Sequence, residues 1–480
     1  MSLQLLTSFL LFGLTLLVFF LITKARTTKS KGSSYPSTDI FPKSYPLVGS
    51  FFSILANRNQ LIQWSTSILQ NTATATFALP KVLGTVTYLT ANPANVQHIL
   101  KTNFYNYPKA ENSEQLSSTF LAMANNGKFR TTLFDFLGNG EQWKFQRQIS
   151  SQEFNTKSLR KFVETVVETE LSDRLIPILE WAAANNDVLD FQDVLQRFAF
   201  DNTCKIAFGY DPEYLLPSFP EAKFARAFDE GKIKRVLNIG SEKRLKIATF
   251  EVQEFSRNII KEKKQKLKEN SSPESMDLLS RFLSSGQYDE KFVSDIIISF
   301  TLAGRDTTSK ALTWYFWLIS EHPQAEKQIL DEIKEKSDTP VYEDIKDMMY
   351  THASLCESMR FYPPVPADTK LAENDDVLPD EIVVKKGMRF KPERWLKREE
   401  DGKWSFEGRD PYTYPVFQAG PRICLGKEMA FLQMKRVVSG VFKRFKVVPT
   451  MEKGVEPEFV AHLTAKMKGG FPVRIVERTE

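Results

Sequence analysis

The sequence predicts a mainly α-helical protein with a small β-sheet region, preceded by a single N-terminal transmembrane helix. Apolar residues recur every three or four positions through most of the chain after residue 150, which is typical of amphipathic helices. Residues 75–90 instead alternate and are rich in β-branched residues, which indicates strands. The chain is 42% hydrophobic and 26% charged, so a disordered chain is excluded, and its three cysteines exclude a disulfide scaffold.

The predicted transmembrane helix rests on Leu3–Ile22, a 20-residue run without a charge, which is long enough to cross a bilayer. Basic residues and no acids follow it up to residue 31, so the positive-inside rule leaves the rest of the chain in the cytosol. A cleaved signal peptide is the alternative, although no small-residue cleavage site is evident. These basic residues account for four of the five net positive charges, so a nucleic-acid surface is not indicated; they are Lys24, Arg26, Lys29 and Lys31.

We therefore expect an anchor at residues 1–23, a linker rich in basic, Ser, Thr and Pro residues at 24–44, and one large domain at 45–480, which no Pro/Gly-rich linker interrupts. The sheet region at 75–90 comes first in this domain, and a hairpin is predicted at 467–476 (MKGGFPVRIV). The helix at Phe292–Ser320 is expected to break in its middle. The predicted helices are Ser158–Asn185, Phe191–Tyr210, Ser241–Asn270, Phe292–Ser320, His322–Lys336, Tyr342–Phe361 and Glu428–Phe445.

The most specific chemical signal surrounds Cys424, which lies in the stretch Phe417-Gln-Ala-Gly420-Pro-Arg422-Ile-Cys424-Leu-Gly426 just before a helix. Backbone N–H groups and a following helix N-terminus hold a thiolate ionised. The glycines let the loop turn under a flat cofactor, and the arginine can reach an anionic group on it. A lone cysteine is more often buried and inert, which is what we expect of Cys204 and Cys356.

This stretch resembles the haem-binding signature F-x-x-G-x-R-x-C-x-G of the cytochromes P-450 at every position. The resemblance implies the cytochrome P-450 fold and haem b as cofactor, with Cys424 as the axial ligand of the iron. A thiolate axial ligand pushes electron density onto the iron and favours O–O cleavage. It also implies that the other signature residues, Phe417, Gly420, Arg422 and Gly426, bind the cofactor.

Ala303-Gly304-Arg-Asp306-Thr307-Thr resembles the oxygen-activation motif of the same family. The resemblance implies that Ala303 and Gly304 border the cofactor, where the glycine lets the helix open for dioxygen. Asp306 and Thr307 would be the catalytic acid–alcohol pair that delivers protons. A helix kink with an exposed aspartate is the alternative for this motif taken alone.

Two further motifs resemble family elements. Glu357 and Arg360 match E-x-x-R, and Arg394 lies in the matching P-E-R-W segment, so the resemblance implies a structural triad that locks the cysteine loop. The alternative is an exposed i, i+3 ion pair, which contributes little to the free energy of folding. Trp143 and Arg147 match W-x-x-x-R, whose members bond the haem propionates; a buried tryptophan beside a solvated arginine is the alternative.

The family resemblance implies a monooxygenase that uses O₂ and electrons from a separate NADPH-dependent cytochrome P-450 reductase, anchored in the endoplasmic reticulum membrane with its catalytic domain in the cytosol. We expect the reductase to meet a basic face near Lys144, Lys427 and Lys435. Segments such as WKFQRQ, FGYDPEYL and YPVFQAGPRICLGKEMAF resemble the plant fatty-acid ω-hydroxylase branch, which suggests hydroxylation at or near the ω carbon. Oxidation of jasmonoyl–amino-acid conjugates is the alternative. By position, the substrate contacts would be Phe300, Thr301, Val365, Pro366 and Leu463.

The chain departs from the family pattern where it looks shortened, near 120–140, 229–235 and 387–391. The last place lacks a strand and a short helix, on the order of 20 residues by usual element lengths. Each departure lies between intact motifs, which is typical of altered splicing or a misdrawn gene model, with natural loop variation as the alternative. A catalytically impaired, non-enzymatic variant is therefore the competing hypothesis for function.

Overall fold

The fold was analysed in a computed structural model of the 480-residue chain. It describes residues 42–45, 48–58, 60–81, 86–108, 140–154, 157–220, 241–269, 277–284, 289–336, 342–368, 370, 376, 378–379, 391–400, 404–452, 454–461 and 464–478. Apart from residues 42–44, 140 and 391, the predicted anchor, the linker and the three shortened places lie outside these ranges. Within the described part of the chain, no helix combines the length and the apolar character needed to cross a bilayer.

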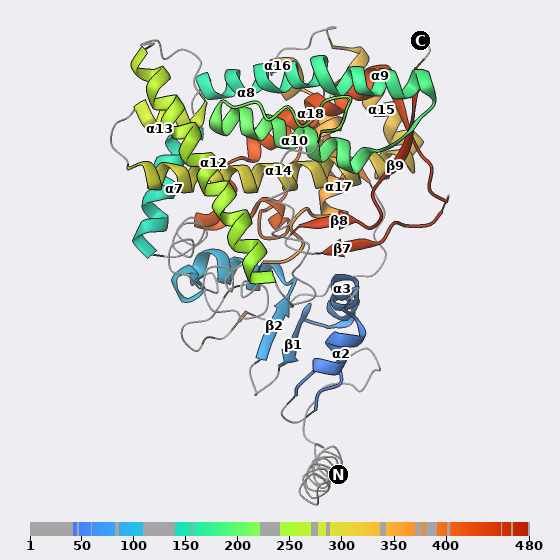
Figure 1. Cartoon of the computed structure of the whole chain (residues 1–480). Coiled ribbons are helices and arrows are strands. Elements are labelled where there is room, and N and C mark those ends of the chain that lie inside the picture. The colour runs from blue at the N-terminus through green and yellow to red at the C-terminus, as the bar shows by residue number, and fades with distance from the viewer. Residues whose placement is uncertain are drawn as a thin grey trace, which may run out of the picture. The chain divides into compact units, whose positions relative to one another are not determined.

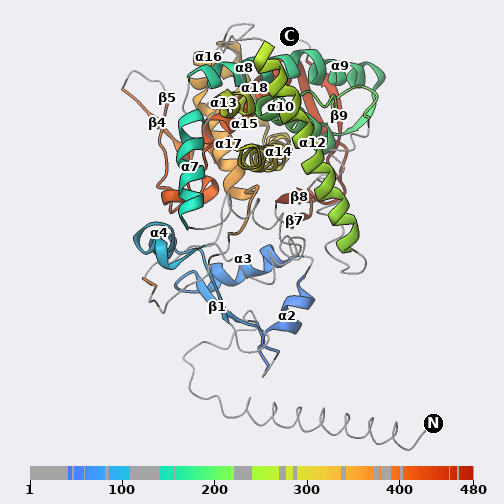
Figure 2. The ribbon, with the colours of Figure 1, turned by 60° about the vertical axis from the view of Figure 1, so that its left-hand side comes forward.

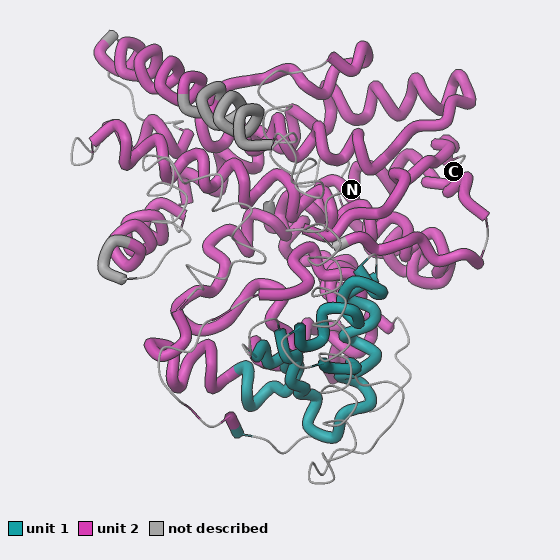
Figure 3. The backbone as a smooth tube through the Cα atoms, turned by 60° about the horizontal axis from the view of Figure 1, so that its bottom comes forward, with its two compact units in different colours: residues 1–96, 379–387 teal, residues 97–378, 388–480 magenta. Residues whose placement is uncertain are grey.

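The chain divides into two compact units (Figure 3): residues 1–96 with 379–387, and residues 97–378 with 388–480. The first unit contains the sheet predicted at 75–90, which is confirmed as an antiparallel pair with Thr76 opposite Thr90. Ile68 packs with Phe77 and Leu79 in its core. The elements of this unit are α2 (Phe51–Ala56), α3 (Leu61–Asn71), β1 (Thr76–Pro80), β2 (Val86–Thr90) and α4 (Pro93–Gln97).

The second unit is mainly helical (Figure 1), as predicted. Its first elements are the π-helix η2 (His98–Thr102) and the 3₁₀ helix η3 (Phe104–Asn106). The helical elements that follow include α7 (Gly140–Phe154), α8 (Lys157–Glu170), the π-helical turn η5 (Leu171–Leu175), α9 (Ile176–Asn185), α10 (Phe191–Phe208), α12 (Ser241–Glu269), α13 (Leu278–Ser284), α14 (Glu290–Ser320), α15 (Pro323–Lys334), α16 (Tyr342–Lys346), α17 (Met349–Phe361) and α18 (Lys427–Arg444).

The single helix predicted at Tyr342–Phe361 is wrong, because the chain forms α16 and α17 there. Met348 leaves the helical region with ψ 83° and is fully buried. The buried Lys435 of α18 donates its Nζ to the carbonyls of Ile345 and Lys346 at 3.0 and 2.9 Å. These tertiary hydrogen bonds satisfy the C-terminal carbonyls of α16, which favours the end of the helix at this point.

The hairpin predicted at 467–476 is also wrong. Gly469 and Gly470 do turn the chain at φ 81° and 88°, but the strands on either side join different sheets. Asp190, which caps α10, accepts the N–H of Phe471 at 2.8 Å and so directs the last strand away from its neighbour. The sheets are β3 (Val188–Asp190), β9 (Pro472–Glu477) and β6 (Phe445–Pro449) in the order β3-β9-β6; β4 (Leu396–Arg398) with β5 (Trp404–Phe406); and β7 (Phe459–Ala461) with β8 (Ala465–Met467).

Helix α14 lies in the middle of the second unit, where Figure 2 views it almost end-on with α10, α12, α13 and α17 around it. The predicted break in this helix is absent, since residues 290–320 are α-helical throughout. Gly304 serves close packing instead. A Cβ on it would come within 3.1 Å of the Thr203 hydroxyl on α10, so a larger residue would push the two helices apart.

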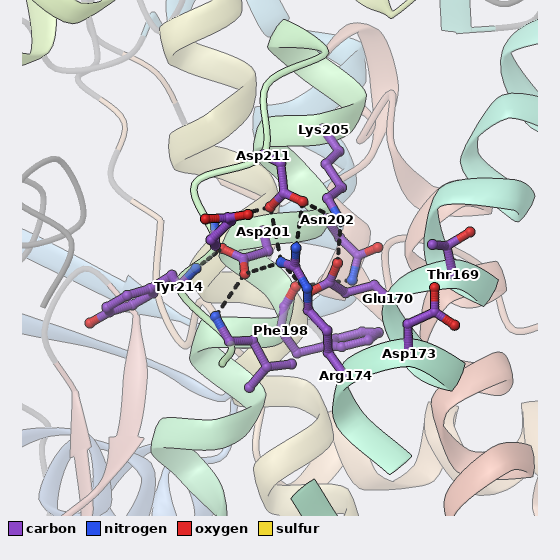
Figure 4. Close-up of polar contacts among 12 residues, drawn as sticks. Thr169, Glu170, Asp173, Arg174, Phe198, Asp201, Asn202, Lys205, Asp211 and Tyr214 are labelled. Atoms are coloured by element: carbon purple, nitrogen blue, oxygen red, sulfur yellow. Dashed lines mark hydrogen bonds and ion pairs between the residues drawn. The ribbon is translucent and has the colours of Figure 1, made fainter. Parts of the chain in front are cut away.

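A network of buried charges joins α8, η5 and α10 (Figure 4). Arg174 lies 3.2 Å from Asp201, 3.3 Å from Glu170 and 2.5 Å from Asp211, while Lys205 bonds Glu170 at 2.5 Å and Asp211 at 3.0 Å. Glu170 and Asp201 are fully buried. Nothing in the sequence pattern predicts this network, because its members come from three helical elements and from the segment after α10.

Asp201 also accepts the backbone N–H groups of Tyr214 and Leu215, so the network fixes the segment that follows α10. The network contains three carboxylates but only two cations. The one excess negative charge is costly to bury. Burial, together with Glu170 and Asp211, raises the pKa of Asp201 to about 7.

We expect Asp201→Asn to flatten the pH dependence of stability. The folded-state pKa of Asp201 is raised, so its contribution is fully present below the unfolded pKa of ~3.9 and is lost as the pH rises through about 7. The free energy of unfolding of the unmodified protein should therefore decline between about pH 4 and about pH 7 more steeply than that of the variant, measured by denaturant unfolding. Asp173→Asn, an exposed change on the π-helical turn that carries Arg174, is the control. Parallel curves for Asp201→Asn and the unmodified protein would contradict the assignment.

Candidate functional site

The loop that carries Cys424 is built from two 3₁₀ turns, η8 (Pro415–Phe417) and η9 (Gly420–Arg422), and ends at the N-terminus of α18. The Cys424 N–H donates to the Phe417 carbonyl at 2.8 Å, which closes the loop upon itself. Cys424 is exposed, whereas Cys204 and Cys356 are buried as predicted. Of the three thiols, the one at the predicted ligand position is therefore the one that a bound group can reach.

The two glycines of the loop have different physical roles. Gly420 has φ +60°, and a Cβ on it would lie 2.1 Å from the Leu100 carbonyl oxygen of η2, so only glycine fits. Gly426 has an ordinary φ of −87°, and the nearest described atom, Cε1 of Phe154, would lie 3.9 Å from its Cβ. The fold itself does not require glycine at 426. The missing side chain leaves open space beside the thiol.

Helix α7 brings the predicted propionate-binding residues to the same loop. Arg147 donates from Nη2 to the Ile423 carbonyl, next to Cys424. Trp143 is buried, and the Arg422 guanidinium lies 4.1 Å from its ring centroid, which is a cation–π contact. The structure therefore brings together Trp143, Arg147, Arg422 and Cys424, which are far apart in the sequence.

The electrostatics around Cys424 favour a bound anion. Burial is the main cause that lowers the pKa of Arg422 to about 10; Asp368 opposes this shift, and the nearby Arg147 adds to it. Burial also lowers the pKa of Arg147. Two guanidinium groups thus crowd each other at the loop, and an anionic partner between them would relieve their repulsion.

The Cys424 thiol itself experiences opposing influences. Burial by neighbouring atoms raises its pKa, whereas the Gly426 N–H, Arg147 and Lys427 lower it. Its exposed surface shows that the thiol can be reached. Bonding to a metal ion would remove the thiol proton outright.

Helix α14 has one accessible stretch, and it coincides with the predicted oxygen-activation motif. Between Val293 and Ile319, all of which are described, the only residues that are not buried are Leu302, Ala303, Gly304 and Thr307. The Thr307 hydroxyl donates to the Ala303 carbonyl at 2.6 Å, so the two lie on one helix face. Helix α14 is therefore accessible to a ligand at the predicted oxygen-activation motif.

Asp306 lies on the buried side of α14, so the alternative of an exposed aspartate is wrong. Its Oδ1 is 3.8 Å from Nε of Arg305, which is itself buried, with its guanidinium 5.0 Å from the Phe200 ring centroid. Asp306 and Thr307, the predicted acid–alcohol pair, are adjacent in sequence, but the Asp306 side chain is buried and Thr307 is partly accessible.

The three residues of the predicted triad are in contact, and their role in locking the cysteine loop stays a prediction. Glu357 is fully buried and accepts Nε and Nη2 of Arg360, both at 2.9 Å, and Nε of Arg394 at 2.8 Å. The sequence analysis missed two further donors, Trp395 Nε1 at 3.0 Å and the Lys391 N–H at 2.9 Å. Burial alone would raise the pKa of Glu357, but these bonds outweigh it and hold the pKa below its usual value.

The predicted substrate residues are spread over several environments. Phe300 and Thr301 are buried on α14, where Thr301 donates to the Ile297 carbonyl at 3.0 Å. Val365 is exposed and Pro366 half-buried in the segment after α17. Leu463 lies outside the described residues. Their roles in substrate binding stay predictions.

Phe154 is a site residue that the sequence analysis missed. Its ring packs 4.8 Å from the Phe300 ring of α14, and it is also the described neighbour of the space beside Gly426. It therefore connects the buried Phe300 of α14 to the cysteine loop. The only sequence signal for this role is its place in α7, the helix that carries W-x-x-x-R.

Of the three lysines predicted to form a basic face, Lys144 and Lys427 are exposed. Lys435 is not available, because it is buried against α16 as described above, and its inclusion was wrong. The packing of α16 against α18 covers that position.

These residues fit a flat anionic group such as haem: an accessible thiol with open space at Gly426, two crowded arginines for its carboxylates, and an accessible face of α14. A protein-family model described as "Cytochrome P450" matches residues 41–389 and 388–470. The chain belongs to the cytochrome P450 family. Family membership makes it a monooxygenase with a haem cofactor and an external electron donor.

Curated relatives of this P450 cover almost its whole length. Cytochrome P450 94A2 of Vicia sativa is 54% identical over 520 aligned positions, which cover 100% of this chain and 99% of the relative. Cytochrome P450 94A1 of Vicia sativa is 52% identical over 91% of this chain and 90% of the relative, and cytochrome P450 94B1 of Arabidopsis thaliana is 42% identical over 97% and 95%. The crystal structure of cytochrome P450 CYP102L1 superposes with a TM-score of 0.71 at 18% identity, covering 90% of this chain and 97% of that chain, which confirms the P450 fold.

The same comparisons locate missing sequence. The alignment with cytochrome P450 94A2 spans 520 positions, 40 more than the 480 residues of this chain, so about 40 positions of the relative have no counterpart here. The family model also matches in two pieces that meet at residues 388–389, within the place predicted to be shortened at 387–391. This P450 therefore lacks sequence that its relatives carry.

Proposed function

We propose that this P450 hydroxylates fatty acids at or near the ω carbon, with NADPH-derived electrons delivered by a separate membrane-bound reductase. The observation that carries the proposal is the accessible stretch of α14, whose four residues Leu302, Ala303, Gly304 and Thr307 bear no charge. An apolar methyl end can lie against such a surface without desolvating a charged group, whereas a carboxylate cannot. The resemblance to the plant ω-hydroxylase branch supports the same substrate class.

In this proposal each residue has a definite task. Cys424 would hold the cofactor, Arg147 and Arg422 would bind its carboxylates, and the absence of a side chain at Gly426 would leave room for it. The haem, when bound, supplies the activation of dioxygen. The Thr307 hydroxyl donates a hydrogen bond on the accessible face of α14, and Asp306 replenishes its proton from the buried side.

We further propose that residues 1–23 anchor the protein in the endoplasmic reticulum membrane, with the catalytic domain in the cytosol. The uncharged run Leu3–Ile22 and the basic residues after it support this orientation. The reductase would then reach the P450 from the same membrane surface.

The substrate proposal is tested with microsomes that contain the full chain and a plant reductase. Lauric acid should be converted to an ω or near-ω hydroxylated product only when NADPH is present, and faster than a jasmonoyl–amino-acid conjugate. Preferential conversion of the conjugate would replace the fatty-acid assignment. No turnover of either substrate by haem-loaded protein would favour the impaired variant, which the missing positions support.

We expect Thr307→Ala to uncouple electron flow from hydroxylation, because the methyl side chain cannot donate a hydrogen bond. Consumption of NADPH should continue while product per NADPH falls by about 10²-fold, the scale of one proton-transfer group. Thr307→Ser, which keeps the hydroxyl, should restore most of the coupling. Equal coupling in Thr307→Ala and the unmodified enzyme would exclude this role.

Reversing the exposed Lys427 to glutamate should slow reduction of the haem by the reductase and weaken its dependence on salt, because a favourable charge pair becomes repulsive. Stopped-flow reduction at several ionic strengths measures the effect. Lys443→Glu at the other end of α18 is a matched control, since Lys443 is also exposed. Equal rates for both variants would remove Lys427 from the docking face.

A further inference from the structure

Gln418 has an unusual backbone conformation in the cysteine loop. Its φ is 60° and its ψ is 176°, a region that residues with a Cβ rarely adopt. The family signature leaves this position unspecified, since residue 418 is the first x in F-x-x-G. A strained residue persists only where its surroundings hold it, so its contacts matter.

The side chain of Gln418 is held by Asp368. Gln418 donates from Nε2 to Oδ2 of Asp368 at 2.6 Å, and the same oxygen accepts Nζ of Lys370 at 2.7 Å. The bond to Gln418 is charge-assisted, which places it among the stronger hydrogen bonds. It joins the cysteine loop to the segment that follows α17.

The conformation of Gln418 determines where the preceding carbonyl points. Rotation about φ of residue 418 turns the peptide plane that contains the Phe417 carbonyl, and this carbonyl accepts the Cys424 N–H at 2.8 Å. With an ordinary negative φ at 418, that carbonyl would turn away from Cys424. The left-handed conformation therefore closes the loop around the thiol.

We propose that Gln418 is a positioning residue for the haem thiolate, held in its left-handed conformation by Asp368. The bond between Gln418 and Asp368 couples the geometry of Cys424 to the segment after α17. That segment includes the predicted substrate residues Val365 and Pro366. This inference rests on the proposed role of Cys424 as iron ligand, and goes beyond it by naming what holds the loop.

A set of variants separates the bond from the backbone strain. Gln418→Ala loses the bond and keeps the strain, so the ratio of the thiolate Soret band to the shorter-wavelength inactive band in the reduced-CO spectrum should fall by roughly tenfold, the scale of one charge-assisted hydrogen bond. Gln418→Gly also loses the bond but has no strained Cβ, so it should retain much more of the thiolate band. Gln418→Glu alone sets two carboxylates together and should be worst.

The isosteric exchange Gln418→Glu with Asp368→Asn restores an N–H···O bond of the same length and should recover most of the thiolate band and the reduction potential. Asp410→Asn, an exposed change just before the loop, is the control. A purely structural role would instead lower the unfolding temperature equally in the alanine and glycine variants. An unchanged band ratio in Gln418→Ala, or equal ratios in Gln418→Ala and Gln418→Gly, would overturn the proposal.

Hydrogen exchange of the Cys424 amide gives a readout that does not need haem. Protection of this amide should drop in Gln418→Ala and persist in Gln418→Gly, whether or not the chain is haem-loaded. If the unmodified protein shows no thiolate band, the ligand assignment fails and the exchange result alone decides the role of Gln418. If the band is present and exchange is unaffected by Gln418→Ala, only the role of Gln418 fails.

Discussion

Cys424→Ser should abolish the thiolate Soret band of this P450 in the reduced-CO spectrum. Serine keeps the backbone N–H that bonds the Phe417 carbonyl, so the loop should stay closed. Its hydroxyl is far less acidic than a thiol and does not supply the thiolate ligand that favours O–O cleavage. We therefore expect substrate hydroxylation to fall to background, while circular dichroism stays that of the unmodified protein.

Cys356→Ala is the matched control for this prediction. Cys356 is buried on α17, and burial raises its pKa to about 12, so it is neither accessible nor ionised at neutral pH. Its removal should cost stability through a small cavity but leave the thiolate band in place. A thiolate band that survives in Cys424→Ser and disappears in Cys356→Ala would reverse the assignment.

Glu357→Ala should be the most destabilising single change in the described part of the second unit. It leaves the guanidinium groups of Arg360 and Arg394, together with the Trp395 indole N–H, without their shared acceptor. Removing one partner from a buried charge cluster costs ~3–5 kcal/mol, a large part of the stability of a typical domain. We expect little folded protein to accumulate, and the remainder to unfold at much lower denaturant concentration.

Glu343→Ala provides a matched control, because Glu343 and Lys346 form the same i, i+3 arrangement at 3.7 Å, with both side chains exposed. Its loss should change the free energy of unfolding by less than ~1 kcal/mol. The pH dependence has a definite sign: the pKa of Glu357 is held below the ordinary glutamate value of 4.5, so its contribution is complete above that pH and is lost as the pH falls below it. Equal effects of the two substitutions would contradict the central place of Glu357.

The sequence predicted the elements that depend on local pattern. The long apolar run at Phe292–Ser320 became α14, and the alternation at 75–90 became β1 and β2. The motif residues Trp143, Arg147, Arg422 and Cys424 met at one loop, because each motif specifies local geometry that the fold then brings together.

What the sequence could not predict depends on contacts between distant residues. Gly304 suggested an opening in a helix, but its partner is Thr203 of α10, and no local pattern names that neighbour. Lys435 was expected at the surface, yet it binds the end of α16. The glycine pair at 469–470 indicated a hairpin, whereas Asp190 directs β9 into another sheet. Tertiary contacts decided all three cases.

The central claim is that this chain, although shorter than its relatives, folds as a haem-thiolate enzyme. A reduced-CO difference spectrum of microsomes that express the full 480-residue chain tests it most directly. The contacts that join Cys424, Arg147, Arg422 and Glu357 to their partners predict a clear thiolate Soret band, with haem bound in proportion to protein. Protein that accumulates without any haem signal would contradict the enzymatic assignment and identify the chain as the impaired variant.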